Sequence, residues 1–131
     1  MNIYWDSSAL VAATMDASVR QRLCQAGQFS RAHSLAEVFS TLTGSRLGFR
    51  IDPADAAEIV HELSGALTFV ELNVAETVAA LRTAKQLGVR GGRVHDFLHS
   101  VAAKKAGCQL LRTLNTGDFE GLFSDGQLGL P

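Results

Sequence analysis

The chain has 131 residues, of which 47% are hydrophobic and 19% charged, so it can form one domain with a real core and is not an intrinsically disordered chain. Its net charge of −1 does not by itself favour nucleic-acid binding. No apolar run is long enough to cross a membrane, and the first residues lack the basic and apolar regions of a signal peptide, so we expect a cytoplasmic protein. Cys24 and Cys108 lie in helix or strand patterns and are expected to be reduced thiols in the core.

Short apolar segments alternate along the chain with longer segments of helical periodicity. Strands are expected at residues 2–5, 28–33, 67–72 and 108–111, and the glycine-rich tail from residue 124 adds one short edge strand or none. Helices are expected from residue 9, at 17–26, from 34 to about 44, at 53–64, 73–87 and 94–106. This alternation predicts a single α/β domain over residues 1–131, with a mainly parallel sheet of four or five strands covered on both faces.

Polar residues that can cap helices set several of the expected helix starts. Ser7 or Ser8 can cap the first helix, and Asp16 can cap the second. The segment Ser34-Leu35-Ala36-Glu37 fits a capping box, in which the serine and the glutamate bond each other's backbone. The pair Asp52-Pro53 offers a carboxylate cap followed by a proline at the first helical position.

Acidic and amide residues follow or face the expected strand ends. Asp6 follows the first strand, Glu37 lies in a first helical turn, and Asp96 opens a helix after two glycines. Asn115 and Asp118 lie beyond the fourth strand. Ligands of open parallel sheets collect at this edge, so we expect these groups to converge. Two carboxylates ~4 Å apart at an effective dielectric of ~20 repel by roughly 4 kcal/mol. A hard divalent cation, Mg²⁺ or Mn²⁺, would offset that repulsion, which indicates metal-assisted phosphodiester chemistry.

Each of these residues also has an ordinary structural interpretation. Asp6 can be a turn or cap residue, and Glu37 can be the glutamate of the capping box. Asp96 can complement a helix dipole, and turn chemistry alone can explain Asn115 and Asp118. The functional hypothesis therefore depends on the residues coming together in space.

His95 and His99 are spaced like the histidines of the zinc motif His-Glu-x-x-His, and His33 is a conceivable third ligand. The acid between them is the shorter Asp96, and the chain is short for a metalloprotease, so a zinc site is not favoured. A basic block that includes Arg90 and Arg93 runs into Asp96. It is either a solvated surface or a region that attracts phosphate.

Four segments together resemble the PIN-domain ribonucleases of the VapC toxin type, over essentially the whole chain. They are Ile3-Tyr4-Trp5-Asp6-Ser7-Ser8-Ala9-Leu10, His33-Ser34-Leu35-Ala36-Glu37-Val38-Phe39, Gly91-Gly92-Arg93-Val94-His95-Asp96-Phe97-Leu98-His99 and residues 110–119. The resemblance implies a three-layer α/β/α sandwich in which Asp6, Glu37 and Asp96 bind one or two Mg²⁺ or Mn²⁺ ions. This sequence departs from the family pattern at Asn115, where many members have Asp. It also implies a homodimer and an inhibitory antitoxin protein.

The function expected from these observations is metal-dependent hydrolysis of RNA, as the toxin of a toxin–antitoxin pair. Asp6, Glu37 and Asp96 would hold the metal, Asn115 or Asp118 would complete the site, and Arg90 and Arg93 would steer the RNA backbone. One alternative is a PIN-like module that has lost catalysis and only binds RNA or a protein partner. Another is a phospho-receiver domain, which would need a second acid beside Asp6 and a phospho-accepting aspartate after the third strand.

Overall fold

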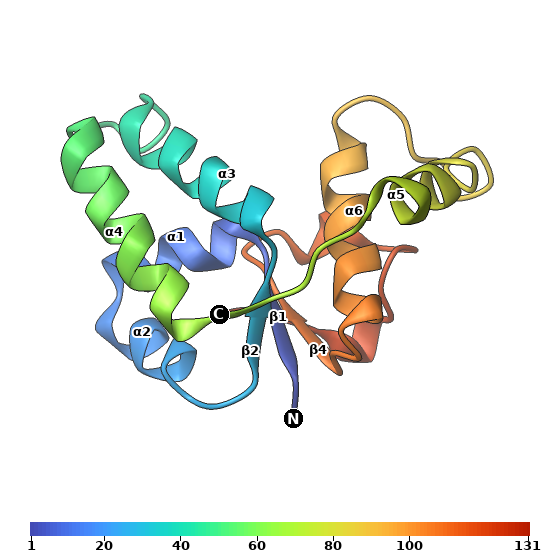
Figure 1. The fold of residues 1–131 in the computed structure, drawn as a ribbon, viewed down its shortest axis with the longest axis horizontal. Helices are drawn as coiled ribbons and strands as arrows, with labels where there is room; N and C mark the ends of the chain where they lie inside the picture. The colour runs from blue at the N-terminus through green and yellow to red at the C-terminus, as the bar shows by residue number, and fades with distance from the viewer.

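A single sheet of five parallel strands forms the centre of the molecule, in the order β3-β2-β1-β4-β5 (Figure 1). The computed structural model describes residues 1–131 except for the side chain of Asp125. The strands are β1 (Ile3–Trp5), β2 (Gln28–Ser30), β3 (Thr68–Phe69), β4 (Leu110–Arg112) and β5 (Leu128–Gly129). In the central register Tyr4 lies between Phe29 and Leu111.

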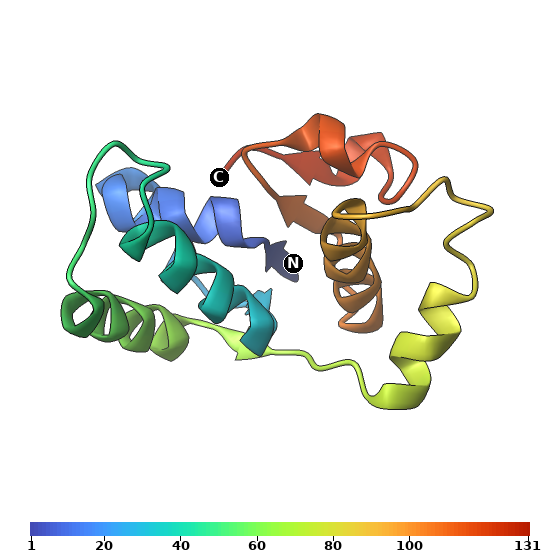
Figure 2. The ribbon, with the colours of Figure 1, turned by 90° about the horizontal axis from the view of Figure 1, so that it is seen from above.

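Helices cover both faces of this sheet, as Figure 2 shows from above. They are α1 (Ser7–Met15), α2 (Ala17–Leu23), α3 (Ala32–Thr43), α4 (Pro53–Ala66), α5 (Val74–Leu81) and α6 (Arg93–Lys105). Two short 3₁₀ turns, η1 (Thr116–Phe119) and η2 (Asp125–Gln127), flank the last strand. Helices α1–α4 share a core with one face of β1, α6 packs on the other face, and α5 packs against the outside of α6. The predicted α/β architecture with three layers is confirmed.

The alternation of side chains along β1 joins the two halves of the core. Ile3 and Trp5 pack among residues of α1–α4, whereas Tyr4 points to the α6 side, as the two-residue period of a strand requires. Tyr4 and Trp5 are both fully buried. The Trp5 indole N–H donates to Oε1 of Gln28 at 2.7 Å, so its only polar atom is satisfied. A three-residue strand thus anchors both layers.

Two of the expected helix starts are wrong. Asp6, not Ser7 or Ser8, caps α1, because its side chain accepts the N–H of Ala9. Helix α3 begins at Ala32, so Ser34 lies inside the helix and not at a cap. Its buried hydroxyl instead accepts a hydrogen bond from Ser30 Oγ at 2.7 Å, which ties α3 to β2.

Other local predictions agree with the structure. Asp16 caps α2, and Asp52 caps α4 with Pro53 as its first residue. The expected tail strand exists as β5, which pairs with β4. Cys108 is buried as expected, but Cys24 is exposed near the end of α2, so its assignment to the core is wrong; both thiols are free.

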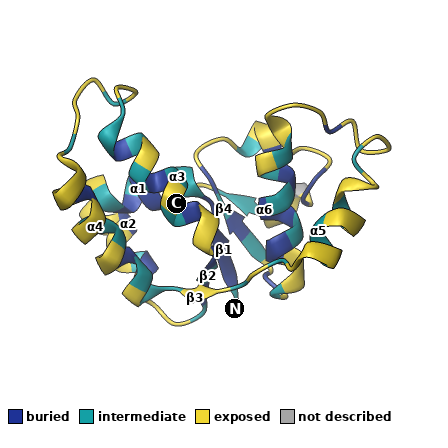
Figure 3. Ribbon diagram, turned by 45° about the horizontal axis from the view of Figure 1, so that its top comes forward, coloured by how far each residue is buried: buried dark blue, intermediate teal, exposed yellow. Residues whose placement is uncertain are grey.

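Burial is uneven over the molecule (Figure 3). Helix α5 has no buried residue, and β3 is exposed, whereas β1 and much of α6 are buried. Within the described part of the chain, no helix combines the length and apolar character needed to cross a membrane.

Candidate functional site

The carboxyl ends of the central strands lie between α3 and α6 (Figure 1), and acidic residues from four segments gather there. Asp6 directly follows β1, Glu37 lies on α3, Asp96 lies in the first turn of α6, and Asp118 lies in η1. These segments are far apart in sequence. The parallel sheet brings these acidic residues together at the carboxyl ends of its strands, as the sequence predicted.

Asp6 is buried and firmly held. Its Oδ1 accepts hydrogen bonds from Ser8 Oγ at 2.7 Å and from the Ala9 N–H at 2.9 Å, and its own N–H donates to the carbonyl of Arg112. Both side-chain bonds use the same oxygen. The second oxygen, Oδ2, has no hydrogen-bond partner among the described residues and is available to a ligand.

Asp96 shows that the carboxylates share one electrostatic environment. Burial is the largest cause that raises the pKa of Asp96 above its ordinary value, followed by the negative charge of Asp118. Asp6 and Glu37 also raise this pKa, and His99 opposes them. All three other carboxylates are therefore close enough to destabilise the ionised form of Asp96. A cation placed among them would remove that cost.

Glu37 is held by a buried histidine. His99 Nε2 lies 2.9 Å from Glu37 Oε1, and His33 Nε2 lies 3.9 Å from the same oxygen. Burial alone would raise the pKa of Glu37, but the hydrogen bond from His99 and the charges of His99, His33 and Arg31 outweigh it and lower the pKa. Glu37 is therefore an ionised carboxylate in a fixed orientation. It is not the capping-box residue of the ordinary interpretation.

The sequence analysis names His99 only as one histidine of a zinc-like pair and misses its role beside Glu37. Its side chain is only 2% exposed, and its Nδ1 lies 2.7 Å from the hydroxyl of Tyr4. Burial raises the pKa of Tyr4 far above its ordinary value, so the phenol stays protonated and shares a hydrogen bond with Nδ1. The other ring nitrogen, Nε2, faces Glu37 Oε1. A polar residue three positions after Asp96, on the buried side of α6, is the signal that could have found it.

The two histidines of the zinc-like motif do not converge. His95 stacks on His33, with ring centroids 5.8 Å apart and an interplanar angle of 12°, whereas His99 turns to Tyr4 and Glu37. No three histidine, cysteine or acidic side chains of the described residues form a ready-made metal-binding group. The structure therefore offers no support for a zinc centre.

The same finding bears on the expected Mg²⁺ or Mn²⁺ site. Among the described residues, Asp6, Glu37 and Asp96 do not form a preassembled three-ligand shell, and Glu37 is also engaged by His99. Magnesium is commonly held through only one or two carboxylates, with waters and substrate phosphates as its other ligands. Asp6, with one unengaged oxygen, and Asp96, repelled by its neighbours, fit that requirement.

Asp118 and Asn115 have different positions. Asp118 lines a hollow of about 320 Å³, together with Asp96, Arg93 and two glycines, Gly92 and Gly117. Asn115 is exposed just before η1, and its N–H donates to Thr113 Oγ1 at 3.0 Å. The structure thus brings Asp118, and not the side chain of Asn115, into the hollow beside Asp96.

The two arginines expected to contact RNA also differ. Arg93 opens α6 and lines the same hollow as Asp96, while its guanidinium donates to the carbonyl of Glu120 at 2.7 Å. Arg90 is exposed in the segment before α6 and is not among the residues lining that hollow. Arg93 is therefore the arginine that borders the candidate site.

No protein-family model matches this sequence, and no sequence among the curated proteins matches it. Among solved structures, the fold is similar to the protein described as "Crystal Structure of PAE2754 from Pyrobaculum aerophilum". The TM-score is 0.67 at 16% sequence identity, and the match covers 92% of this chain and 84% of that one. At this identity the similarity extends to the fold alone, over nearly the whole chain.

Proposed function

We propose that this protein is a metal-dependent endoribonuclease that hydrolyses RNA phosphodiester bonds. The observation that carries the proposal is the gathering of Asp6, Glu37, Asp96 and Asp118 at one sheet edge, where the other three raise the pKa of Asp96. Carboxylates that repel one another at the carboxyl ends of the strands are suited to binding a divalent cation. The sequence resemblance to PIN-domain ribonucleases supports RNA as the substrate.

Each residue has a distinct role in this proposal. Asp6 and Asp96 would hold a Mg²⁺ or Mn²⁺ ion, which when bound polarises a phosphate and acidifies water. Glu37, ionised and oriented by His99, can accept a proton from the attacking water. Arg93 beside Asp96 offers a positive charge to the RNA backbone.

The same resemblance supports a cellular role as the toxin of a toxin–antitoxin pair in the cytoplasm. It further supports a homodimer and an antitoxin protein that covers the site. Co-purification with the product of an adjacent small gene, followed by loss of RNA cleavage in the complex, is the measurement that checks this role.

The central experiment compares RNA cleavage by the wild type, Asp96→Asn and Asp55→Asn, with Mg²⁺ or with a chelator. Asp55 is an exposed carboxylate in the first turn of α4 and serves as the matched control. We expect Asp96→Asn or chelation to lower the cleavage rate at least about 100-fold, because the charge that holds the ion is lost. Asp55→Asn should cleave like the wild type. Full cleavage by Asp96→Asn, or in the chelator, refutes the proposal.

A second candidate is a PIN-like module that binds RNA or a protein without cutting. Two observations favour it: Asn115 stands where many family members have an acid, and Glu37 is engaged by His99. RNA binding without chelator-sensitive cleavage by the pure protein would support this alternative.

A further inference from the structure

A groove along α3 reaches Glu37, and neither Asp96 nor Asp118 lines it. Its volume is about 310 Å³, and its lining is mostly polar: Ser7, His33, Ala36, Glu37, Ser40, Thr41 and Arg46. Nothing in the catalytic proposal uses the part of this groove beyond Glu37.

One stripe of α3 forms the floor of the groove. His33, Glu37 and Ser40 are spaced by four and three residues, so they share one helix face. From His33 to Thr41 the helix rises roughly 12 Å, at about 1.5 Å per residue, so the groove follows about two turns of α3. The lining has hydroxyls and few apolar groups, so it suits a polar chain better than an apolar peptide helix.

The stacked rings of His33 and His95 stand at the catalytic end of the groove. Both residues are exposed, and the rings are nearly parallel, at 12°. His33 borders Glu37 at 3.9 Å, and His95 directly precedes Asp96. A flat pair of rings open to solvent is a surface on which an unpaired base can stack.

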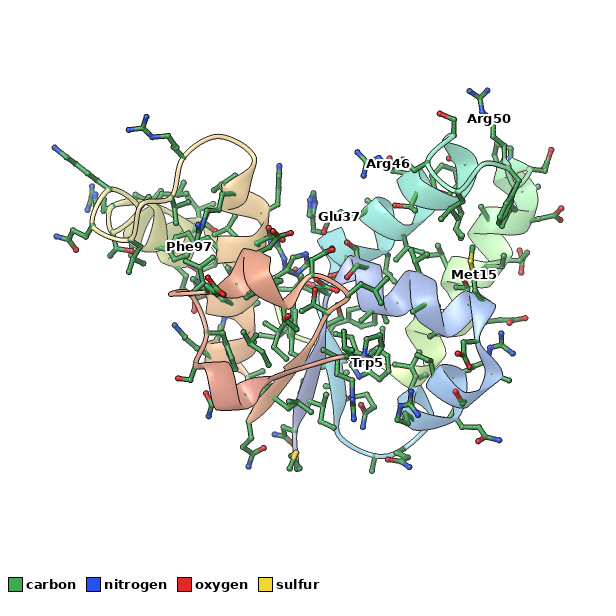
Figure 4. All side chains as sticks on the ribbon, turned by 180° about the vertical axis from the view of Figure 1, so that it is seen from behind. Trp5, Met15, Glu37, Arg46, Arg50 and Phe97 are labelled. Carbon is green, nitrogen blue, oxygen red and sulfur yellow. The ribbon has the colours of Figure 1, made fainter. Side chains whose placement is uncertain are left out.

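The positively charged side chain of Arg46 lies at the other end of the groove. Arg46 follows α3, is exposed and forms no ion pair with any described residue. Figure 4 shows it leaning toward the opening above Glu37, whereas Arg50 of the same loop points away into solvent. Arg46 lines the groove and Arg50 does not.

Each of the two hollows thus combines carboxylate and arginine: Glu37 with Arg46 on α3 and its following loop, and Asp96 and Asp118 with Arg93 on the α6 side. We propose that the α3 groove binds the single-stranded RNA that flanks the scissile bond, with Arg46 at a backbone phosphate and the His33–His95 pair stacked against a base. This inference rests on the proposed function and specifies how its substrate is held. Single strands are favoured because paired bases cannot turn outward to stack on the rings.

The test measures binding of a fluorescently labelled single-stranded RNA in excess chelator, so that binding is separated from metal-dependent cleavage. Arg46→Ala should weaken binding and lower the slope of log affinity against log salt by about 0.7, the value for one phosphate contact on a single strand. Arg50→Ala, which removes the same charge from the same loop, should leave the slope unchanged. His33→Ala should weaken binding about tenfold through lost stacking.

A duplex of the same sequence should bind more weakly than the single strand and should not respond to His33→Ala. Equal effects of Arg46→Ala and Arg50→Ala, or wild-type binding by His33→Ala, overturn the inference. If the wild type does not cleave RNA but the binding differences among the variants are found, the nuclease proposal is wrong and the groove proposal stands. If the wild type cleaves RNA but His33→Ala and Arg46→Ala bind RNA as well as the wild type does, only the groove proposal is wrong. Circular dichroism of each variant checks that it is folded.

Discussion

The hydrogen bond between Tyr4 and His99 offers a quantitative test of how the site is built. Both side chains are buried, and the hydroxyl lies 2.7 Å from Nδ1. We consider Tyr4→Phe, which removes only the hydroxyl, and His99→Leu, which replaces the ring by an apolar side chain of similar size. The double variant replaces both partners by apolar groups.

The expected magnitudes follow from which polar atoms lose their partners. Tyr4→Phe leaves Nδ1 of His99 buried without its hydrogen-bond partner, which costs about 1–2 kcal/mol. His99→Leu leaves the Tyr4 hydroxyl buried without its partner and also releases Glu37, so it should cost about 3 kcal/mol. In the double variant the orphaned hydroxyl is gone. Its cost should therefore fall short of the sum of the single costs by about 1–2 kcal/mol.

Urea unfolding of the four proteins, followed by fluorescence of the buried Trp5, measures these free energies. Strict additivity of the two substitutions would show that Tyr4 and His99 do not interact, and would refute the hydrogen bond between them. A second readout concerns Glu37, whose pKa the hydrogen bond from His99 lowers. In His99→Leu the pKa of Glu37 should rise. The rise of the cleavage rate with pH, on the acidic side of the pH–rate profile, should therefore move to higher pH.

Two further predictions concern other titratable groups. The pKa of Asp96 is raised in the fold, so its ionisation costs stability as the pH rises through that pKa, and the cost is present at pH 7. Asp96→Asn should therefore raise the free energy of unfolding in a chelator, and Mg²⁺ should raise the melting temperature of the wild type more than that of the variant; a less stable variant would contradict this account. Cys24 is exposed, whereas burial raises the pKa of Cys108 to about 11, so a thiol reagent at pH 8 should modify Cys24 rapidly and Cys108 only on unfolding. Two equally fast thiols in the native protein would contradict the burial of Cys108.

The architecture was largely predictable because its signals are local. The alternation of short apolar runs with helical periodicity identified β1 to β4, and Asp16 and the pair Asp52-Pro53 marked helix starts that the structure confirms. The prediction of a capping box at Ser34 was wrong because a contact with another element decides the role of the Ser34 side chain. Its hydroxyl bonds Ser30 of the neighbouring strand, a contact that no spacing within the helix can reveal.

The candidate site was predictable only in part. Acids at strand ends could be expected to converge, because the carboxyl ends of parallel strands share one edge, and the pKa of Asp96 shows that they do. The sequence marks His99 as a polar residue on the buried side of α6 but does not pair it with Glu37, because the two lie 62 residues apart and meet only through the docking of α6. The choice between Asn115 and Asp118 depended on the shape of a 3₁₀ turn, which composition alone does not specify.

The hydrogen bonds from Tyr4 through His99 to Glu37 connect all three layers of the fold. They begin on the central strand, pass through a helix of one outer layer and end on a helix of the other. These bonds therefore tie α3 to α6 across the carboxyl end of β1. A substitution at His99 would accordingly loosen the contact between the two outer layers as well as the orientation of Glu37.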